Sequence, residues 1–330
     1  MTASQTWQNI LQQVLKTNGE RQRMATALGL SPMTLTRWAS GESNPQRPHM
    51  VRLVQIVQPQ YRDELIEALE KVYPEIHSLL KEETQDHIPA DFFAELLSTR
   101  TTTTESLRFW RISDMVLKQF LTQLDPNQLG MSISIVQCMP PSQKHGNKIR
   151  SLRERAGKGT LPWTADLEHI ALFLGMESLG GYASEVRHIV NIDDLTKDKL
   201  LPAYQYEYEI SAAAHPLMFG GRIAGCLSAS STQIGYFTQQ RQSLLIAFSN
   251  LAALAFDNDD FYDPKLIELR VMPKPEFQRP ILDGFRQRVS RILTTATHQR
   301  YRMSNQEAEQ IAWSEIEDAL LTLPDEAYSH

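Results

Sequence analysis

Residues 20–57 constrain the fold of this chain most strongly, because their side chains follow the spacing of two helices joined by a tight turn. Ala25 lets two helices cross closely, and Gly29 can adopt the left-handed conformation that ends the first helix. Ser31 is a good N-cap for a second helix, and Pro32 suits its first position. The stretch therefore predicts a helix, a short turn and a second helix.

The second of these helices has one apolar face and one polar face. Leu35 and Trp38 lie three residues apart, so they share the face that packs on the first helix. The residues expected to face outward are Pro32, Met33, Thr36, Arg37 and Ser40. Since the outward face of the second helix reads the major groove in helix-turn-helix proteins, this face is a candidate DNA-binding surface.

The same stretch resembles the Cro/repressor-type helix-turn-helix family over about residues 6–58, including a trailing turn with Gly41 and Pro45. Ala39 departs from the family pattern, because many members carry glutamate at that position. The resemblance implies double-stranded DNA as a partner. The alternative is an ordinary hairpin of two helices with no DNA-binding role.

The candidates for contact with DNA are Arg21, Pro32, Met33, Thr36, Arg37, Ser40, Asn44 and Arg47. Arg37 is expected to donate two hydrogen bonds to a guanine edge, and Met33 and Thr36 to contact a thymine methyl group. The remaining polar side chains are expected to reach phosphates, which position a protein without specifying a sequence. The alternative for each residue is a solvated surface position.

The distribution of charge agrees with a DNA-binding head. The whole chain carries a net charge of −6, which taken alone argues against nucleic acid. Residues 1–58, however, hold six basic and two acidic side chains, a balance of +4, and the remainder carries −10. A basic head on an acidic body can contact phosphates while the body stays away from DNA.

Other classes of protein are disfavoured by composition. No run of eighteen apolar residues predicts a transmembrane helix, and the N-terminus shows no signal-peptide pattern. Two cysteines, Cys138 and Cys226, give no metal or disulfide framework. We therefore expect a cytoplasmic protein without a metal or an evident cofactor.

The element pattern divides the chain into four parts: a helix-turn-helix domain at 1–58, a helical connector at 59–104, a domain at 105–256, and a helical extension at 257–330. The apolar stripe of the connector is expected either to pair with a second copy or to dock on the next domain. The extension is expected to form helices at 276–298 and 304–323, the latter with a capping box at Ser304 and Glu307. It serves either as a clasp on the preceding domain or as a dimerisation element.

The third part is expected to be α+β with a mainly antiparallel sheet. Helices are expected at 105–124, 166–173 and 238–256, and strands at 131–139, 147–156, 187–192, 209–216 and 222–230. The glycine pair Gly220-Gly221 predicts a hairpin between the last two strands.

Residues 105–256 also resemble a GAF domain. The resemblance rests on His215-Pro216-Leu217, on the glycine turn, on Gly225, Leu227 and Ser230, and on the helix entry Phe237-Thr238. Upstream, the segment from Ser178 to Asp194 matches as well. The family implies a six-stranded sheet, a ligand cavity between the sheet and the middle helices, and first and last helices that often form a dimer bundle.

The resemblance places the candidate ligand-binding residues in segments that border the cavity of GAF domains: Tyr182, Ser184, Arg187, His188, Ser211, Cys226 and Ser228. Arg187 is the best candidate partner for a carboxylate or a phosphate. Strand alternation puts Cys226 and Ser228 on one face. Core packing is the alternative for each of these residues.

A basic run extends from Lys144 to Lys158 and also contains His145, Lys148, Arg150, Arg153 and Arg155. It lacks the glycine and hydroxyl spacing of a phosphate-binding loop. We interpret it as a solvated strand edge whose charge resists edge pairing, with an anionic ligand or DNA as the alternative.

These patterns together predict a one-component transcription regulator that binds operator DNA as a homodimer and senses a small molecule through its GAF-like domain. The alternative is a DNA-binding protein whose GAF-like domain is a ligand-free module for dimerisation or protein interaction. We expect no enzymatic activity. The rival enzymatic hypothesis is a methionine-sulfoxide reductase, which would use the cysteines.

Overall fold

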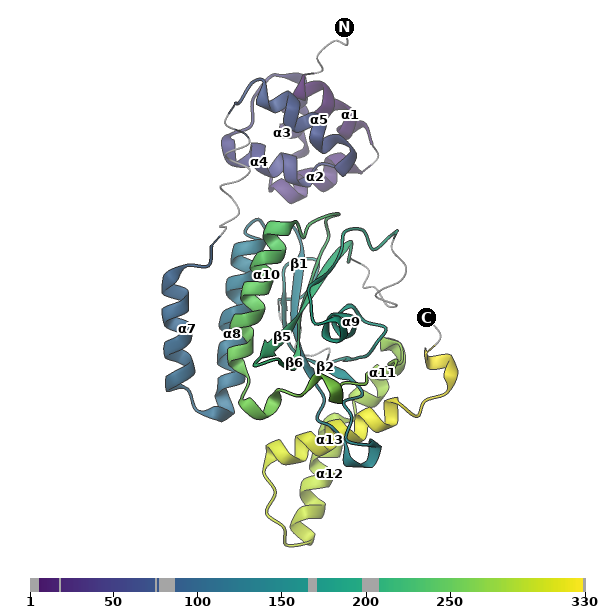
Figure 1. Cartoon of the computed structure of the whole chain (residues 1–330). Coiled ribbons are helices and arrows are strands. Elements are labelled where there is room, and N and C mark those ends of the chain that lie inside the picture. Colours follow the sequence, from purple (N-terminus) through teal and green to yellow (C-terminus); the bar gives the residue numbers. More distant parts are fainter. Residues whose placement is uncertain are drawn as a thin grey trace. The chain divides into compact units, whose positions relative to one another are not determined.

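The computed structural model describes residues 6–17, 19–74, 76, 87–165, 171–197 and 208–328. The chain forms two compact units, drawn in Figure 1. The first comprises Met1–Gln85 with Gln123–Leu129, and the second comprises Asp86–Thr122 with Gly130–His330.

The first unit is helical. Its helices are α1 (Trp7–Lys16), α2 (Glu20–Leu28), α3 (Pro32–Ser40), α4 (Arg47–Ile56) and α5 (Pro59–Glu70). Apolar side chains from all of them form one core, in which Trp7, Leu11 and Leu35 are almost completely buried. Such burial supplies most of the stability of short helices like these, which are marginal in isolation.

Helix α5 belongs to this core. Leu65 and Leu69 are fully buried in it, and Ile76 closes the same cluster. The apolar stripe expected to pair with a second copy or to dock on the next domain is therefore buried within the first unit over this helix. The rest of the stripe, at residues 77–83, lies outside the described residues.

The second unit is built on a six-stranded antiparallel sheet with the order β3-β2-β1-β6-β5-β4. Its strands are β1 (Met131–Cys138), β2 (Leu152–Gly159), β3 (Phe173–Leu174), β4 (Val190–Ile192), β5 (Ser211–Phe219) and β6 (Arg222–Ser231). This architecture confirms the predicted α+β class and the GAF-like six-stranded sheet.

Helices cover both faces of the sheet. Figure 1 shows α8 (Glu105–Leu124) and α10 (Gln239–Ala252) on one side, with α7 (Ala90–Thr102) beyond α8, and α9 (Leu179–Val186) on the other side. In β1, Ser132 and Ser134 line the cavity on the side of α9, so strand alternation places the buried side chains of Ile133 and Ile135 on the opposite face. The alternation thus gives the sheet one apolar face and one face with several hydroxyl groups.

The hairpin between β5 and β6 has the expected two-residue turn. Phe219 pairs with Arg222, and Gly220 and Gly221 have φ angles of +57° and +77°. Positive φ at both turn positions is the geometry that matches the right-handed twist of the strands, and glycine adopts it without steric cost.

Two expectations about the middle elements are wrong. The second strand begins at Leu152, five residues later than predicted, because Lys148 and Ile149 form isolated bridges with Ser142 and Ile267 instead. The helix expected at 166–173 does not reach its predicted end, since Phe173 lies in β3 and pairs with Arg153. Residues 166–170 of that expectation lie outside the described residues.

The C-terminal extension contains α11 (Pro275–Leu282), α12 (Phe285–His298) and α13 (Asn305–Leu320). The prediction of a single helix at 276–298 is wrong, because the helix is interrupted at Asp283-Gly284. Pro280 also lacks the backbone N–H that would donate a hydrogen bond within the helix. The capping box at Ser304 and Glu307 is confirmed. Short 3-10 turns lie at Gln143–His145, Ala253–Ala255, Asn258–Asp260, Pro264–Leu266 and Asp325–Tyr328.

Candidate functional site

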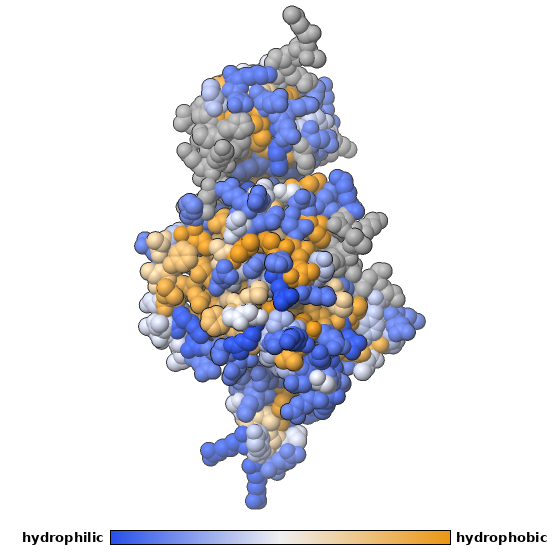
Figure 2. Space-filling model, in the orientation of Figure 1, coloured by the Kyte–Doolittle hydropathy of each residue, from blue (hydrophilic) through white to orange (hydrophobic). Residues whose placement is uncertain are grey.

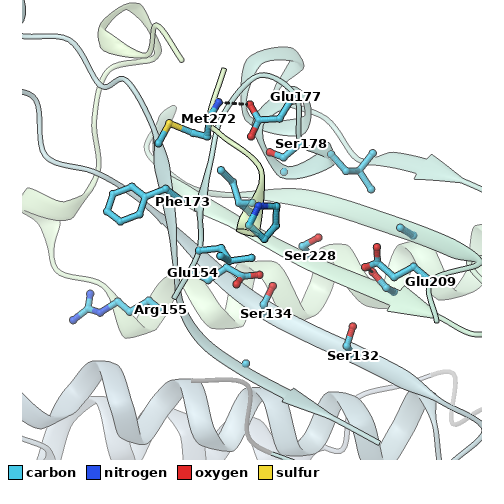
Figure 3. Close-up of a pocket in the computed structure, with 18 of the residues that line it drawn as sticks. Ser132, Ser134, Glu154, Arg155, Phe173, Glu177, Ser178, Glu209, Ser228 and Met272 are labelled. Carbon is cyan, nitrogen blue, oxygen red and sulfur yellow. Dashed lines mark hydrogen bonds between the residues drawn. The ribbon is translucent and has the colours of Figure 1, made fainter. Parts of the chain in front are cut away.

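A cavity of about 150 Å³ lies in the second unit, on the side of the sheet that α9 covers. Its floor is formed by strands β1, β2, β5 and β6, one wall by the start of α9, and another by the segment that leads into α11. Figure 3 shows hydroxyl and carboxyl groups from several of these elements around the same space. The expectation of a cavity between the sheet and a middle helix is therefore confirmed.

Glu154 supplies the central carboxyl group of the cavity. It lies in β2 between two arginines, at an irregularity where Ile135 pairs with Ala156 and Val136 pairs with Glu154. Figure 3 shows its carboxyl group beside Ser134 and the side chain of Arg155 extending away from it. Glu154 forms no ion pair within the part of the chain that the structure describes.

The two flanking arginines are engaged elsewhere. The guanidinium carbon of Arg155 lies 3.5 Å from the centre of the Phe109 ring, and Arg155 also donates to Gln137 at 2.7 Å. The guanidinium carbon of Arg153 lies 4.1 Å from the centre of the Trp313 ring. Cation–π stacking of this kind is favourable where the cation is desolvated, so both positive charges are held away from the neighbouring carboxylate.

The environment of Glu154 favours its neutral form. Burial raises its pKa from the ordinary value of 4.5 to about 7, an effect that the backbone of Leu172 opposes and the negative charge of Glu209 reinforces. An ionised carboxylate in such a place is costly unless a cation or hydrogen-bond donors compensate it.

Replacing Glu154 with glutamine is therefore expected to change how stability depends on pH. A carboxyl group with a raised pKa contributes most to stability below pH 4.5, and this contribution is lost as the pH rises through 7. As the pH rises from 4.5 to 8, the free energy of unfolding of the Glu154→Gln variant should increase by about 2–3 kcal/mol relative to that of the wild type. Thermal unfolding at pH 4.5, 6 and 8 measures this difference in stability, with Glu185→Gln, at an exposed position of α9, as the control. A difference that stays constant with pH would contradict the raised pKa of Glu154.

Two further carboxyl groups line the cavity in different ways. Glu209 is 8% exposed and accepts a hydrogen bond from Ser230 at 2.6 Å. Glu177 accepts hydrogen bonds from the backbone amides of Gly175 at 2.8 Å and of Met272 at 2.9 Å. Burial raises the pKa of Glu177, and these amides oppose the rise. Glu177 therefore has a structural role, since it ties the start of α9 to the C-terminal segment.

The C-terminal segment forms a wall of the cavity, which the sequence did not predict. Met272, Pro273, Pro275 and Gln278 all line it. Gln278 is 2% exposed, donates to the carbonyl groups of Phe173 and Pro273, and accepts from the amide of Phe173 at 2.8 Å. The prolines at 273 and 275 predict only a domain boundary, and no pattern in the sequence indicates that Gln278 is buried against Phe173.

Of the candidate ligand-binding residues, Ser228 lines the cavity and the others do not. Ser184 donates to the carbonyl of Gly180, and Ser211 donates to the carbonyl of Gln233. Tyr182 is 41% exposed on the outer face of α9, and Arg187 and His188 are exposed beyond its end.

Cys226 shares the face of Ser228, as the alternation predicted, but it packs beneath Gly180 in a buried cluster with Cys138. Burial raises the pKa of the Cys226 thiol to about 12 and that of Cys138 further. Because the thiolate is the reactive form of cysteine, neither group is activated in this conformation.

The basic run at 144–158 is not a solvated edge, because β2 pairs with β1 along its length, its first two residues also pair with β3, and most of the charged side chains of the run have partners. Arg150 donates to Glu317 and to Asp318, both at 2.6 Å, and the side chains of Arg150 and Glu317 are 9% and 2% exposed. His145 lies 3.2 Å from Asp318, and Lys158 lies 3.1 Å from Asp114. The run thus serves mainly to fasten α13 and α8 to the sheet.

No family model matches the chain, and no curated protein matches it significantly. Among similar solved structures is a type II free methionine-R-sulfoxide reductase from Thermoplasma acidophilum, with 19% identity and a TM-score of 0.34, covering 48% of this chain and 99% of that one. Another is the GAF domain of an Acinetobacter phosphoenolpyruvate-protein phosphotransferase, with 16% identity and a TM-score of 0.35, covering 50% and 90%.

A third similar structure is the GAF domain of a two-component sensor histidine kinase from Bacillus halodurans, with 15% identity and a TM-score of 0.31, covering 44% of this chain and 95% of that one. At these values no residue role carries over from the neighbours to this chain.

The described residues include no helix with the length and apolar character needed to cross a membrane. They also contain no group of three or more histidine, cysteine, aspartate or glutamate side chains arranged to hold a metal ion.

In the first unit, the predicted turn and second helix have the expected local geometry. Gly29 is left-handed with φ of +66°, and the side chain of Ser31 accepts from the amide of Thr34. In α3, Leu35, Trp38 and Ala39 are buried. The exposed candidates are Arg21, Met33, Thr36, Arg37, Ser40 and Asn44, whereas Pro32 is half-buried and the side chain of Arg47 lies outside the described set.

Proposed function

We propose that this chain is a DNA-binding transcription regulator whose first unit contacts operator DNA and whose second unit binds a small molecule. The observation that carries the DNA-binding part is the division of α3 into two faces. Leu35 and Trp38 are buried against the other helices, whereas Met33 is 68% exposed and the side chain of Arg37 is 57% exposed. A helix that projects such residues after a tight turn fits the major groove of DNA.

The neighbours of Arg37 leave it available to a base edge. Its Nε lies 3.8 Å from the carboxylate of Glu42, a pair exposed enough that it contributes little stability. The hydroxyls of Thr36 and Ser40 donate to carbonyls of their own helix, those of Pro32 and Arg37. Hydroxyl groups reorient readily, so these donors can turn to a phosphate or a base.

Replacing Arg37 with alanine is expected to weaken binding to a selected operator by about 1–3 kcal/mol and to relax specificity at one base pair. The matched control is Lys16→Ala, which removes the same charge from the end of α1 and should change affinity weakly and uniformly among sequences. Fluorescence anisotropy with labelled duplexes measures both variants. Equal losses for the two would contradict the groove assignment.

The cavity supports a sensory second unit over an empty module. It combines mainly apolar walls with a few converging polar groups, the usual character of a small-molecule site. The ligand-free module remains the second candidate, and it predicts that DNA affinity is the same whatever occupies the cavity.

The proposed regulator acts as a homodimer through α7 and α8. Phe93 and Leu97 on α7, and Leu107 and Trp110 on α8, are between 40% and 55% exposed. Figure 2 shows an apolar area over these helices. Burying such a patch against its copy would remove it from water and hold two DNA-binding units together.

A further inference from the structure

We propose that the cavity of the second unit takes a small organic cation, an ammonium or amidinium group carried on a short apolar body. This assignment rests on the proposed sensory function of the cavity and names the chemical class of its ligand. It differs from the expectation that Arg187 would bind a carboxylate or a phosphate, because Arg187 lies exposed beyond the end of α9.

The charge of the described cavity wall is negative. Glu154 and Glu209 enter it from β2 and from the residues before β5, and Ser134 and Ser228 add hydroxyl groups between them. Arg155 is the one basic residue among the described residues of the lining, and its guanidinium group is stacked on Phe109. An anionic ligand would meet the carboxyl group of Glu154, which no described cation compensates, whereas a cationic ligand would pair with it.

The carboxyl group of Glu154 is the anchor for this cation. It is directed into the cavity and forms no ion pair with any described residue. The backbone of Leu172 interacts with this carboxyl group, but no described cation pairs with it. Leaving a desolvated carboxylate without a counter-charge is unfavourable, so a ligand that carries a positive charge supplies what the described residues do not. Glu177 does not compete, because both of its oxygens accept backbone amides.

A metal ion does not fit the same groups. The described residues contain no cluster of three or more metal-ligating side chains, and the cavity is partly apolar. Trp163, Leu172 and Leu179 line it together with Met272 and Pro273, so the ligand must have a hydrocarbon part. A cavity of about 150 Å³ has room for a molecule about the size of benzene, which corresponds to roughly six non-hydrogen atoms.

The test uses the full chain and three probes of matched length: n-pentylammonium, 1-pentanol and pentanoate. Isothermal titration calorimetry at pH 8 measures each affinity, and thermal unfolding checks that the variants are folded. We expect n-pentylammonium to bind at least about tenfold more tightly than either other probe. Glu154→Gln should reduce that affinity at least about tenfold, and Glu185→Gln should leave it unchanged.

Pentanol or pentanoate binding as tightly as the amine, or no binding of the amine, would overturn the inference, and neither comparison depends on a variant. An unchanged affinity in folded Glu154→Gln would overturn it as well. The proposed function fails separately: an amine that binds through Glu154 without altering the affinity for DNA supports the inference and contradicts the sensory role.

Discussion

The Arg150→Ala variant should lose about 3–5 kcal/mol of stability in the region where α13 packs on the sheet. Arg150 is the cation that compensates Glu317, whose side chain is 2% exposed and also accepts from Ser151. Burial already raises the pKa of Glu317, and the hydrogen bond from Ser151 and the charge of Arg150 hold it down. Without the arginine, an uncompensated carboxylate remains in the interior, and the loss should grow as the pH rises.

Hydrogen exchange of the α13 amides measures this effect locally, which avoids treating a chain of two units as a single two-state system. Protection should fall about a hundredfold or more. Arg291→Ala is the matched control, because it removes an arginine from an exposed pair with Glu315 and should cost less than about 1 kcal/mol. Similar losses in the two variants would show that the pair with Glu317 does not fasten the C-terminal helices.

The Gly175→Ala variant should open the wall of the cavity. A Cβ atom at this position would lie 1.8 Å from the carbonyl oxygen of Arg270, so the backbone of one segment must move. The two segments are joined here by hydrogen bonds. The amide of Met176 donates to the carbonyl of Arg270, and the carboxylate of Glu177 accepts from the amides of Gly175 and Met272. We expect a loss of about 3 kcal/mol or more, and weaker binding of any cavity ligand.

The control for Gly175→Ala is Gly146→Ala. A Cβ atom at Gly146 meets no atom within 4 Å, and the variant should cost only about 1 kcal/mol through its φ of +70°. Hydrogen exchange of the segment at 270–278 and calorimetry with n-pentylammonium follow the two consequences. Unchanged protection of that segment in Gly175→Ala would contradict the role given to this contact.

Local signals in the sequence predicted local structure well. Gly29 and Ser31, the glycine pair at 220–221, and the capping box at 304–307 each determine the conformation of a few neighbouring residues, and the structure has them as expected. The alternation in β6 also placed Ser228 and Cys226 on one face, as the structure has them.

The cavity could not be derived in the same way, because its walls come from distant parts of the chain. Gln278 reaches Phe173 across 105 residues, and no local pattern indicates which strand it meets. The prediction of a solvated edge for the basic run is wrong for the same reason. Arg150 donates to the carboxylates of Glu317 and Asp318, which lie 167 and 168 residues away in the sequence. Glu154 was hidden within that run, although a lone carboxylate between two arginines on a strand is a signal that alternation could have exposed.

The proposed regulator must bind DNA in a sequence-specific way through two copies of its first unit. The most direct measurement selects duplexes bound by the full chain from a random pool at fixed salt, followed by sequencing. We expect enrichment of a motif with two related half-sites in inverted orientation, and loss of that motif when Arg37 is replaced with alanine. A bound pool with the same base composition as the input, or a motif unaffected by Arg37→Ala, would contradict the assignment of α3 to the major groove.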